Sequence, residues 1–214
     1  MLTVHHLGIS QSDRIVWLCE ELEIPYTLIR YQRDPVTQFA PPAYRALHPF
    51  GTAPVITDGD RVLAESGAII EYIIARHGGG RLAVKPEQPE FADYLFWLHF
   101  GNGSFMPSCM IDLIAQRVEI APSGAPFMRA IGERSGRAYA LIERRLGESP
   151  YLAGGEFTAA DIINFFPLTT MRAFVPRDLS GSPHTRAYIR RVAGRPGYRR
   201  AMQKADPGFA PPLE

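Results

Sequence analysis

The sequence predicts two domains: an α/β domain over residues 1–78, then an all-α helical domain over residues 89–214. Up to residue 78, short apolar runs alternate with segments of helical periodicity, and a tight hairpin precedes the last helix. Beyond residue 89, every periodic segment has helical spacing. The intervening residues 79–88 are rich in glycine, proline and charge, which is typical of a linker.

The first domain begins with a strand, a helix and a second strand. Leu2–Leu7 is an apolar-rich run that ends at a glycine. In Asp13–Glu23 the apolar residues recur at helical spacing, and a proline follows shortly after. Tyr26–Tyr31 is the second apolar run. Because strand–helix–strand units join parallel strands by a right-handed crossover, we expect these two strands to be parallel.

The rest of the first domain is an irregular stretch, a hairpin and a helix. Pro35–Leu47 is proline-rich, and we expect at most one short helix in it. Ala53–Thr57 and Arg61–Ala64 flank an Asp-Gly turn, which predicts an antiparallel hairpin. Ser66 then opens a strongly apolar helix that ends at a His-Gly pair, residues 77 and 78.

The second domain is expected to contain helices only. Its longest helical pattern, Phe91–Val118, includes two glycines and a proline, so we expect a bend near Gly101–Gly103 and Pro107. The other expected helices are Phe127–Leu146, Thr158–Met171, Pro183–Ala193 and Pro196–Lys204.

Composition excludes several classes of partner. The 214 residues carry a formal net charge of +1, so no global field favours nucleic acid or an anionic membrane. No apolar run approaches the ~18 residues that span a bilayer, and the first ten residues lack a secretory signal pattern. The two cysteines, Cys19 and Cys109, lie in separate helical patterns and form no metal-ligand cluster. We therefore expect a cytoplasmic protein without a metal, a membrane or a nucleic-acid partner.

Ser10 and Ser12 lie in the loop between the first strand and the first helix, where a hydroxyl can donate to a bound thiolate. A free cysteine thiol has a pKa near ~8.5, so little of it is ionised at neutral pH. Hydrogen bonds and a helix N-terminus stabilise the anion and so lower that pKa. The residue pattern alone also fits a turn or capping role for both serines.

Two further junctions suit an amino-acid or peptide ligand. Pro54 stands just inside an apolar strand, where either a trans strand start or a cis bond is expected. A cis bond would turn the backbone of Ala53 outward, and an extended peptide could pair with it. Glu65 and Ser66 lie between a strand and a helix, with Ser66 as the expected N-cap. The same geometry can bind a carboxylate, while Glu65 pairs with an ammonium.

No other segment carries a recognisable catalytic pattern. The sequence has no P-loop, dinucleotide fingerprint, His-Glu-x-x-His motif or serine-hydrolase elbow. His5 and His6 fall within the first expected strand, and we expect each to be a packed or surface side chain. Neither cysteine lies in the loop at residues 10–14, so dithiol redox chemistry is disfavoured.

Four motifs occur in order along the chain: Ser10-x-x-x-Arg14, Pro49–Val55, Leu63–Ile69 and Tyr151–Ile162. Together they resemble the cytosolic glutathione transferase superfamily over nearly the whole chain, as its serine loop, cis-proline loop, glutamyl-binding segment and helical capping motif. The serine motif is similar to the serine-type classes, theta, phi and related bacterial and fungal enzymes. The capping motif is the most specific, because Thr158 and Asp161 stand three apart and can cap a helix reciprocally.

The resemblance implies a thioredoxin-like first domain that binds reduced glutathione as co-substrate. Ser10, with Ser12 as the alternative, would be the catalytic residue that stabilises the thiolate. The γ-glutamyl end would be held by Glu65 and Ser66. Thr52, Ala53 and Pro54 would form the glutathione-binding loop, with backbone pairing from Ala53 and a cis bond at Pro54.

The activity implied is that of a detoxification transferase: glutathione thiolate attacks a small apolar electrophile, without a metal. The family is usually dimeric, so we expect a homodimer. We expect three separate parts of the chain to form an apolar second substrate site. Candidates are Ile9, the segment Phe105–Leu113, and Phe174 or Phe209.

Two departures from the family pattern keep other functions open. Thr52 stands where relatives often have Lys or Gln, and Asn102 stands where one subgroup often has an acidic residue. One alternative is therefore a non-catalytic binding or regulatory relative. Independently of these two residues, a glutathione-dependent peroxidase or isomerase is another alternative, although a peroxidase would normally have a cysteine in the Ser10 loop.

Overall fold

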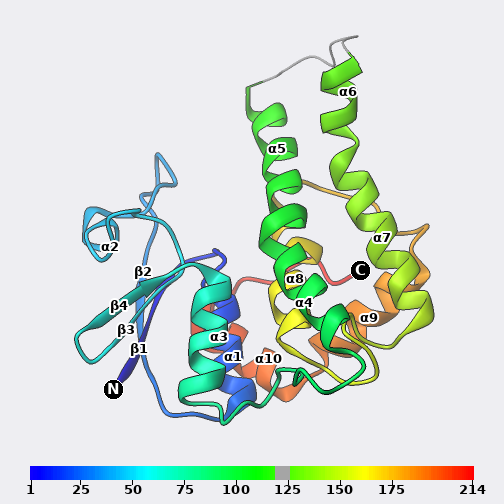
Figure 1. The fold of residues 1–214 in the computed structure, drawn as a ribbon. Helices are drawn as coiled ribbons and strands as arrows, with labels where there is room; N and C mark the ends of the chain where they lie inside the picture. The colour runs from blue at the N-terminus through cyan, green and yellow to red at the C-terminus, as the bar shows by residue number, and fades with distance from the viewer. Residues whose placement is uncertain (119–125) are drawn as a thin grey trace. The chain divides into compact units, whose positions relative to one another are not determined.

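The computed structural model describes residues 1–118 and 126–214, which form two compact units (Figure 1). The first unit comprises residues 1–83 and 193–210, and the second comprises residues 84–192 and 211–214. The sequence predicts that everything after residue 88 belongs to the second domain. The structure differs, because residues 193–210 belong to the first unit.

The first unit is built on a four-stranded sheet in the order β2-β1-β3-β4. As expected, β1 (Leu2–Leu7) pairs in parallel with β2 (Thr27–Tyr31), and α1 (Asp13–Leu22) connects them. β3 (Val55–Asp58) runs antiparallel to β1 and to β4 (Arg61–Ala64), which confirms the hairpin. The mixed sheet therefore carries one parallel and two antiparallel pairings.

Helices cover the two faces of this sheet. α1 and α3 (Ser66–Arg76) lie together beside the strands in Figure 1, and α2 (Pro42–Arg45) is the short helix expected in the irregular stretch. Successive strand side chains point to opposite faces. In β1, Leu7 packs against Tyr44 of α2, whereas His6 faces the loop that begins α1.

The second unit begins with the predicted bent helix. α4 (Phe91–Phe100) runs through a π-helical turn, Gly101–Phe105, into α5 (Met106–Arg117). At the bend, Asn164 Nδ2 donates to the carbonyl of Trp97 at 2.7 Å, within the hydrogen-bond ladder of the helix. A Cβ on Gly101 would lie 2.9 Å from Ile163, so the close approach at this turn requires glycine.

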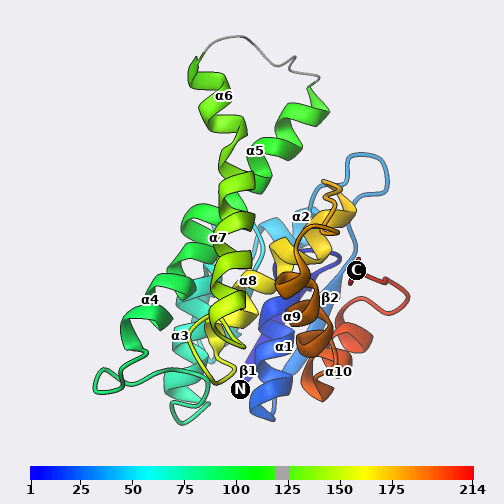
Figure 2. The same cartoon turned by 90° about the vertical axis from the view of Figure 1, so that its right-hand side faces the viewer.

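Every residue of α8 (Ala159–Leu168) is buried. α4 packs on α8, and Figure 2 shows α7 (Arg134–Glu148) and α9 (Pro183–Ala193) beside it. α6 (Pro126–Gly132) precedes α7, so the single helix expected over 127–146 is two helices separated at residue 133. A 3-10 turn, Thr170–Ala173, follows α8. In the described part of this unit we find no strand, as the sequence predicts.

The capping box at the start of α8 is present. Asp161 Oδ2 accepts from the backbone N–H of Thr158 at 2.8 Å, and Thr158 Oγ1 accepts from Ala160 N–H. These bonds satisfy backbone donors that a helix N-terminus otherwise leaves unpaired.

None of the helices in the described ranges has the length and apolar character needed to cross a membrane.

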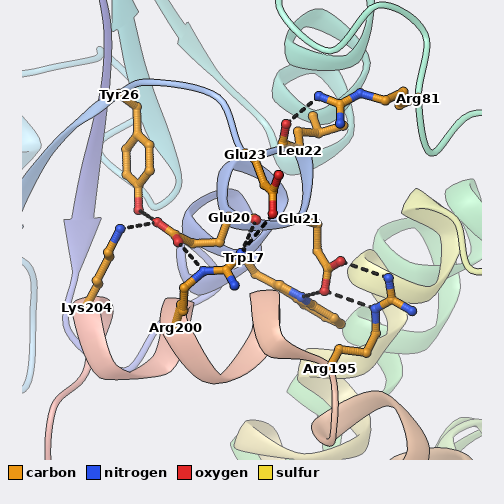
Figure 3. A network of polar contacts seen from close by, with 10 residues as sticks. All are labelled: Trp17, Glu20, Glu21, Leu22, Glu23, Tyr26, Arg81, Arg195, Arg200 and Lys204. Atoms are coloured by element: carbon orange, nitrogen blue, oxygen red, sulfur yellow. Dashed lines mark hydrogen bonds and ion pairs between the residues drawn. The ribbon is translucent and has the colours of Figure 1, made fainter.

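The C-terminal helix α10 (Pro196–Ala205) packs on α1 within the first unit. A Cβ on Gly197 would lie 2.6 Å from the carboxyl carbon of Glu21, so a glycine permits this approach. Figure 3 shows the polar contacts between the two helices. Arg195 pairs with Glu21 through two hydrogen bonds, of 2.9 and 3.0 Å, while Lys204 and Arg200 pair with Glu20. The end of α10 is therefore fixed against α1.

Candidate functional site

The candidate site residues lie in loops that leave one edge of the sheet. Leu7 ends β1, Val55 begins β3 and Ala64 ends β4, and these three residues share one buried apolar cluster. Ala53 packs against the same cluster. Because β3 is antiparallel to both neighbours, these chain ends meet at one edge. The loops that carry the predicted serines and the cis-proline therefore leave the sheet at the same edge.

The loop after β1 has an unusual backbone at Ile9, where φ is +47°. A β-branched residue rarely adopts this left-handed conformation, which costs of order 1–3 kcal/mol unless its surroundings impose it. Two side chains hold this residue in place. Asp206 Oδ1 accepts the Ile9 N–H at 2.9 Å, and Arg33 donates to the carbonyls of Gly8 at 2.8 Å and Ile9 at 3.3 Å. The loop is thus fixed from both sides immediately before Ser10.

The hydroxyls of Ser10 and Ser12 contact each other at 2.7 Å. Ser10 Oγ donates to the carbonyl of Leu7 at 2.6 Å, and Ser12 Oγ accepts the Leu7 N–H at 3.1 Å. Ser12 occupies the N-cap position of α1, yet its side chain makes no capping bond and lies 2.9 Å from His6 Nδ1. Ser12 is 0% exposed and Ser10 is 6% exposed, so Ser10 has the hydroxyl nearer to solvent.

The peptide bond between Ala53 and Pro54 is cis, the conformation that the resemblance implies. Thr52 is exposed and Ala53 is half-buried just ahead of β3. A turn closed by the bond from Gly51 N–H to the His48 carbonyl precedes them, and Gly51 has a φ of +69° that favours glycine. The backbone of Ala53 is thus placed at the end of β3 where an extended peptide can pair.

Glu65 and Ser66 lie at the start of α3, but each stands one helix position later than the sequence predicts. Ser66 is the first residue of the helix rather than its N-cap, and Glu65 holds the N-cap position without a side-chain capping bond. Glu65 has a φ of +73°, a second strained non-glycine residue in the site. Its carboxylate side chain is exposed, whereas Ser66 is buried.

A buried arginine connects the loop after β1 with the start of α3. Arg14 Nη1 donates to Gln11 Oε1 at 2.7 Å and to Ser66 Oγ at 3.4 Å. Burial lowers the pKa of Arg14 to about 10, with an opposing effect from Asp13, so the guanidinium remains charged at neutral pH. A fixed cation and a helix N-terminus together favour an anion beside Ser66.

Sequence reasoning missed three residues of this site. Arg33 and Asp206 act on the backbone of the loop, and His6 contacts Ser12. Alternation along β1 could have placed His6 on the face with the first helix. Asp206 is separated from Ile9 by 197 positions, so no local pattern could have found it.

Both cysteines are unsuited to redox chemistry. Burial, followed by the charge of Glu20, raises the pKa of Cys19 to about 12. Burial also raises the pKa of Cys109 to about 12, with a smaller contribution from Asp112. Because the thiolate is the reactive form, these buried thiols are inert at neutral pH.

The residues suggested for an apolar second site have different environments. Ile9 and Phe209 line a cavity of about 480 Å³ in the first unit, together with Arg33 and Asp206. In the second unit, Cys109 lines a separate cavity of about 270 Å³. Phe105 is fully buried core, and Phe174 is 39% exposed.

Comparison with known proteins identifies the family. Residues 10–76 match the model of the glutathione S-transferase N-terminal domain, and residues 128–196 match that of the C-terminal domain. Glutathione S-transferase 3 of Schizosaccharomyces pombe is 32% identical, over 96% of this chain and 88% of that protein. The chain belongs to the glutathione S-transferase family of enzymes. The resemblance found in the four motifs is thereby confirmed, and so is the thioredoxin-like domain followed by a helical one.

Two other proteins to which the chain is similar have different names. The crystal structure of a glutathione S-transferase from Actinobacillus pleuropneumoniae has a TM-score of 0.87 and 30% identity, covering 98% of this chain and 97% of that one. A protein of Escherichia coli named as the disulfide-bond oxidoreductase YfcG is 28% identical, over 97% of both chains. Family membership thus fixes the fold and the enzyme class more firmly than the individual reaction.

Proposed function

We propose that this protein binds reduced glutathione at the sheet edge described above and activates its thiol for attack on small apolar electrophiles. The observation that carries the proposal is the common apolar cluster of Leu7, Ala53 and Ala64. It holds the loop of Ser10, the cis-proline and the start of α3 at one edge of the sheet. These are the three segments that a γ-glutamyl tripeptide would need.

Each segment has a separate role in the proposal. The backbone of Ala53, before the cis Pro54, pairs with the cysteinyl unit in the manner of an added strand. Ser66 and the N-terminus of α3 bind the γ-glutamyl carboxylate, and Glu65 pairs with the ammonium beside it. Thr52 offers no charge to the glycyl carboxylate, so this end of the tripeptide is held less firmly than the other.

Ser10 supplies the chemistry. Its hydroxyl exchanges the Leu7 carbonyl for the thiolate, and hydrogen bonds to an ionised group are roughly twice as strong as neutral ones. The N-terminus of α1 adds a favourable potential for an anion. Both interactions stabilise the thiolate relative to the thiol, so they lower the pKa of bound glutathione and raise the fraction of nucleophile at neutral pH.

Isothermal titration calorimetry with reduced glutathione tests the binding site. We expect saturable binding of one glutathione per chain, weakened roughly tenfold or more in Glu65→Ala through loss of a charge-assisted bond. Glu71→Ala is the matched control, because Glu71 is an exposed carboxylate further along the same helix. If the parent protein binds no glutathione at millimolar concentrations, the non-catalytic alternative replaces this proposal.

A second reaction deserves a parallel assay because of the Escherichia coli relative. Glutathione-dependent disulfide exchange would use the same thiolate, with a disulfide substrate in place of the electrophile. Initial rates with a chloronitroaromatic and with a mixed disulfide of glutathione compare the two directly. A higher kcat/KM with the disulfide would assign the protein to disulfide exchange.

We also propose a homodimer in the cytoplasm. Large apolar side chains are exposed on two helices of the second unit, Phe96 at 50% on α4 and Ile114 at 53% on α5, and a second copy of the chain could bury them. Light scattering should give twice the chain mass, and Phe96→Glu should shift it towards the monomer. A monomeric parent protein would contradict the dimer.

The proposed cytoplasmic location is supported by the cysteines, because two buried, unpaired thiols suit a reducing compartment.

A further inference from the structure

Ser10 is the first of four polar side chains that form a continuous buried series of contacts. Ser10 Oγ lies 2.7 Å from Ser12 Oγ, Ser12 Oγ lies 2.9 Å from His6 Nδ1, and His6 Nε2 lies 3.1 Å from Asp206 Oδ1. All four residues are at most 9% exposed, and His6 is 0% exposed. The last contact is in ion-pair range, but the ring N–H is not aligned with the oxygen, so it acts mainly through charge.

Which atom donates in each of these contacts depends on the protonation state of His6. Each serine hydroxyl has one proton, and Ser12 Oγ already accepts the N–H of Leu7. A neutral imidazole with its proton on Nε2, facing Asp206, leaves Nδ1 as an acceptor for the Ser12 proton. A protonated imidazole donates from Nδ1 to Ser12, so Ser12 donates to Ser10 and Ser10 donates outward. The two protonation states of the ring therefore reverse the Ser12 hydroxyl. Ser10, which donates to the Leu7 carbonyl at 2.6 Å, must turn its proton towards Ser12 before that proton can be passed on.

We propose that His6, supported by Asp206, receives the thiol proton of glutathione through Ser12 and Ser10. This inference rests on the proposed function. As the thiol proton passes to Ser10 Oγ, the Ser10 proton passes to Ser12 Oγ, and the Ser12 proton passes to His6 Nδ1. The S–H bond breaks and an Nδ1–H bond forms. Both serines end neutral, and the products are a thiolate and an imidazolium beside the Asp206 carboxylate.

In the product state, each group of the series donates its hydrogen bond to the next one towards the thiolate. Imidazolium donates to Ser12, Ser12 to Ser10 and Ser10 to the thiolate, which is the arrangement that stabilises negative charge on sulfur. Histidine suits the role because its ordinary pKa of about 6.5 lies within reach of a thiol near ~8.5. His6 and Ser12 touch no substrate atom, so they are positioning residues and Ser10 is the catalytic one.

The charges around His6 agree with this role. Asp206 comes from the end of α10, and its carboxylate is the charge in contact with the ring among the described residues. Arg33, after β2, directs its guanidinium to the carbonyls of Gly8 and Ile9. Arg30, opposite His6 in the register of β2, is exposed, and α1 contributes Asp13 and Arg14 in its first turn. The charge in contact with the ring is therefore the negative charge of the Asp206 carboxylate.

The test compares thiolate formation with proton release. Glutathione is added to the full chain in weakly buffered solution near pH 7; thiolate is followed by its ultraviolet absorbance and released protons by a pH indicator. In the parent protein we expect thiolate to appear with clearly less than one proton released per thiolate. His6→Asn keeps an amide where Nδ1 stood but accepts no proton. We expect its thiolate fraction and kcat/KM to fall roughly 10-fold to 100-fold, with the remaining thiolate releasing a full proton.

Asp206→Asn is the second variant, and it guards against a folding defect at His6. Its amide oxygen can still accept the Ile9 N–H, while the charge beside the imidazole is lost. We therefore expect a smaller fall in the thiolate fraction and in kcat/KM than in His6→Asn, and a smaller rise in the protons released per thiolate. His77→Asn and Asp58→Asn are matched controls, because these two residues form a His–Asp pair at 2.7 Å elsewhere in the same unit. Both controls should resemble the parent protein.

The outcomes separate this inference from the proposed function. A parent protein that forms thiolate and releases one proton for each overturns the role of His6, as does a His6→Asn variant that matches the parent. Either result leaves glutathione activation by Ser10 intact. A parent protein that binds glutathione without forming any thiolate overturns the proposed function, and the proton path with it.

Discussion

Lys204 on α10 donates to the carboxylate of Glu20 on α1 at 2.5 Å, so a helix near the end of the chain is tied to the helix that follows the candidate serines. Arg200 adds a second cation at 3.1 Å, and Tyr26 donates its hydroxyl at 2.7 Å (Figure 3). Asp206, which supports the loop after β1, comes directly after α10. The contact therefore links the stability of the first unit to the geometry of its site.

The first prediction concerns pH. Although burial raises it, the pKa of Glu20 is held below its ordinary value by hydrogen bonds from Lys204, Tyr26 and Arg200. A folded pKa below the unfolded value of about 4.3 stabilises the protein above that value, and the effect is lost as pH falls through the folded pKa. We expect Glu20→Gln to lower the free energy of unfolding at pH 7 by about 1–3 kcal/mol, and the difference to vanish in acid.

Urea unfolding followed at several pH values measures this effect. Glu23→Gln is the control, because Glu23 is exposed and reaches Arg200 only at 3.9 Å. A pH-independent difference between Glu20→Gln and the parent protein would contradict the role assigned to the charge.

The second prediction separates the two serines. Ser10→Ala removes the thiolate donor and, with it, the hydrogen bond to the Leu7 carbonyl, so we expect a large loss of kcat/KM, roughly 100-fold, with about 1 kcal/mol of lost stability. Ser12→Ala leaves the buried N–H of Leu7 and Nδ1 of His6 without their partner, which costs about 1–3 kcal/mol. Thermal unfolding and steady-state kinetics of both variants provide the comparison. Full activity in Ser10→Ala would transfer the catalytic role to Ser12 or to a backbone donor.

Particular residues show what the sequence could and could not predict. The strands, the hairpin and the bend near Gly101 follow from local periodicity, glycine and proline, which act within a few residues. The position of Ser66 as first residue of α3 was missed, because cap positions depend on the backbone angles of Glu65. The return of α10 to the first unit, and with it Asp206, depends on contacts between residues almost 200 positions apart.

The third prediction concerns the cysteines, and it bears on disulfide exchange. Burial raises the pKa of both Cys19 and Cys109 to about 12, so neither presents a thiolate at neutral pH. We expect both to react with an aromatic disulfide reagent only after denaturation. Cys19→Ala should lose stability through its buried cavity and keep its activity per folded molecule, as should Cys109→Ala. Loss of disulfide-exchange activity in either folded variant would show that a protein thiol takes part.

The last prediction concerns Asp161, a carboxylate with a structural role in the second unit. Its oxygens accept from Leu152 N–H at 3.0 Å, from the hydroxyl of Tyr188 at 3.0 Å and from Thr158. Asp161→Ala leaves these buried donors unpaired, so we expect a loss of about 2–4 kcal/mol, more than a helix cap alone provides. Asp178→Ala is the control, because Asp178 makes comparable bonds in an exposed turn. Activity per folded molecule should be unchanged in both.

Asp161 also has the opposite pH dependence from Glu20. Burial raises its pKa to about 6, although the hydrogen bonds from Leu152, Thr158 and Tyr188 oppose that shift. With a folded pKa above the unfolded value of about 3.9, the carboxyl group contributes most stability when protonated, and that contribution falls as pH rises from about 4 to 6. Asp161→Asn abolishes this titration. Its free energy of unfolding should therefore decline less than that of the parent protein over this range, and equal slopes would show that Asp161 titrates normally.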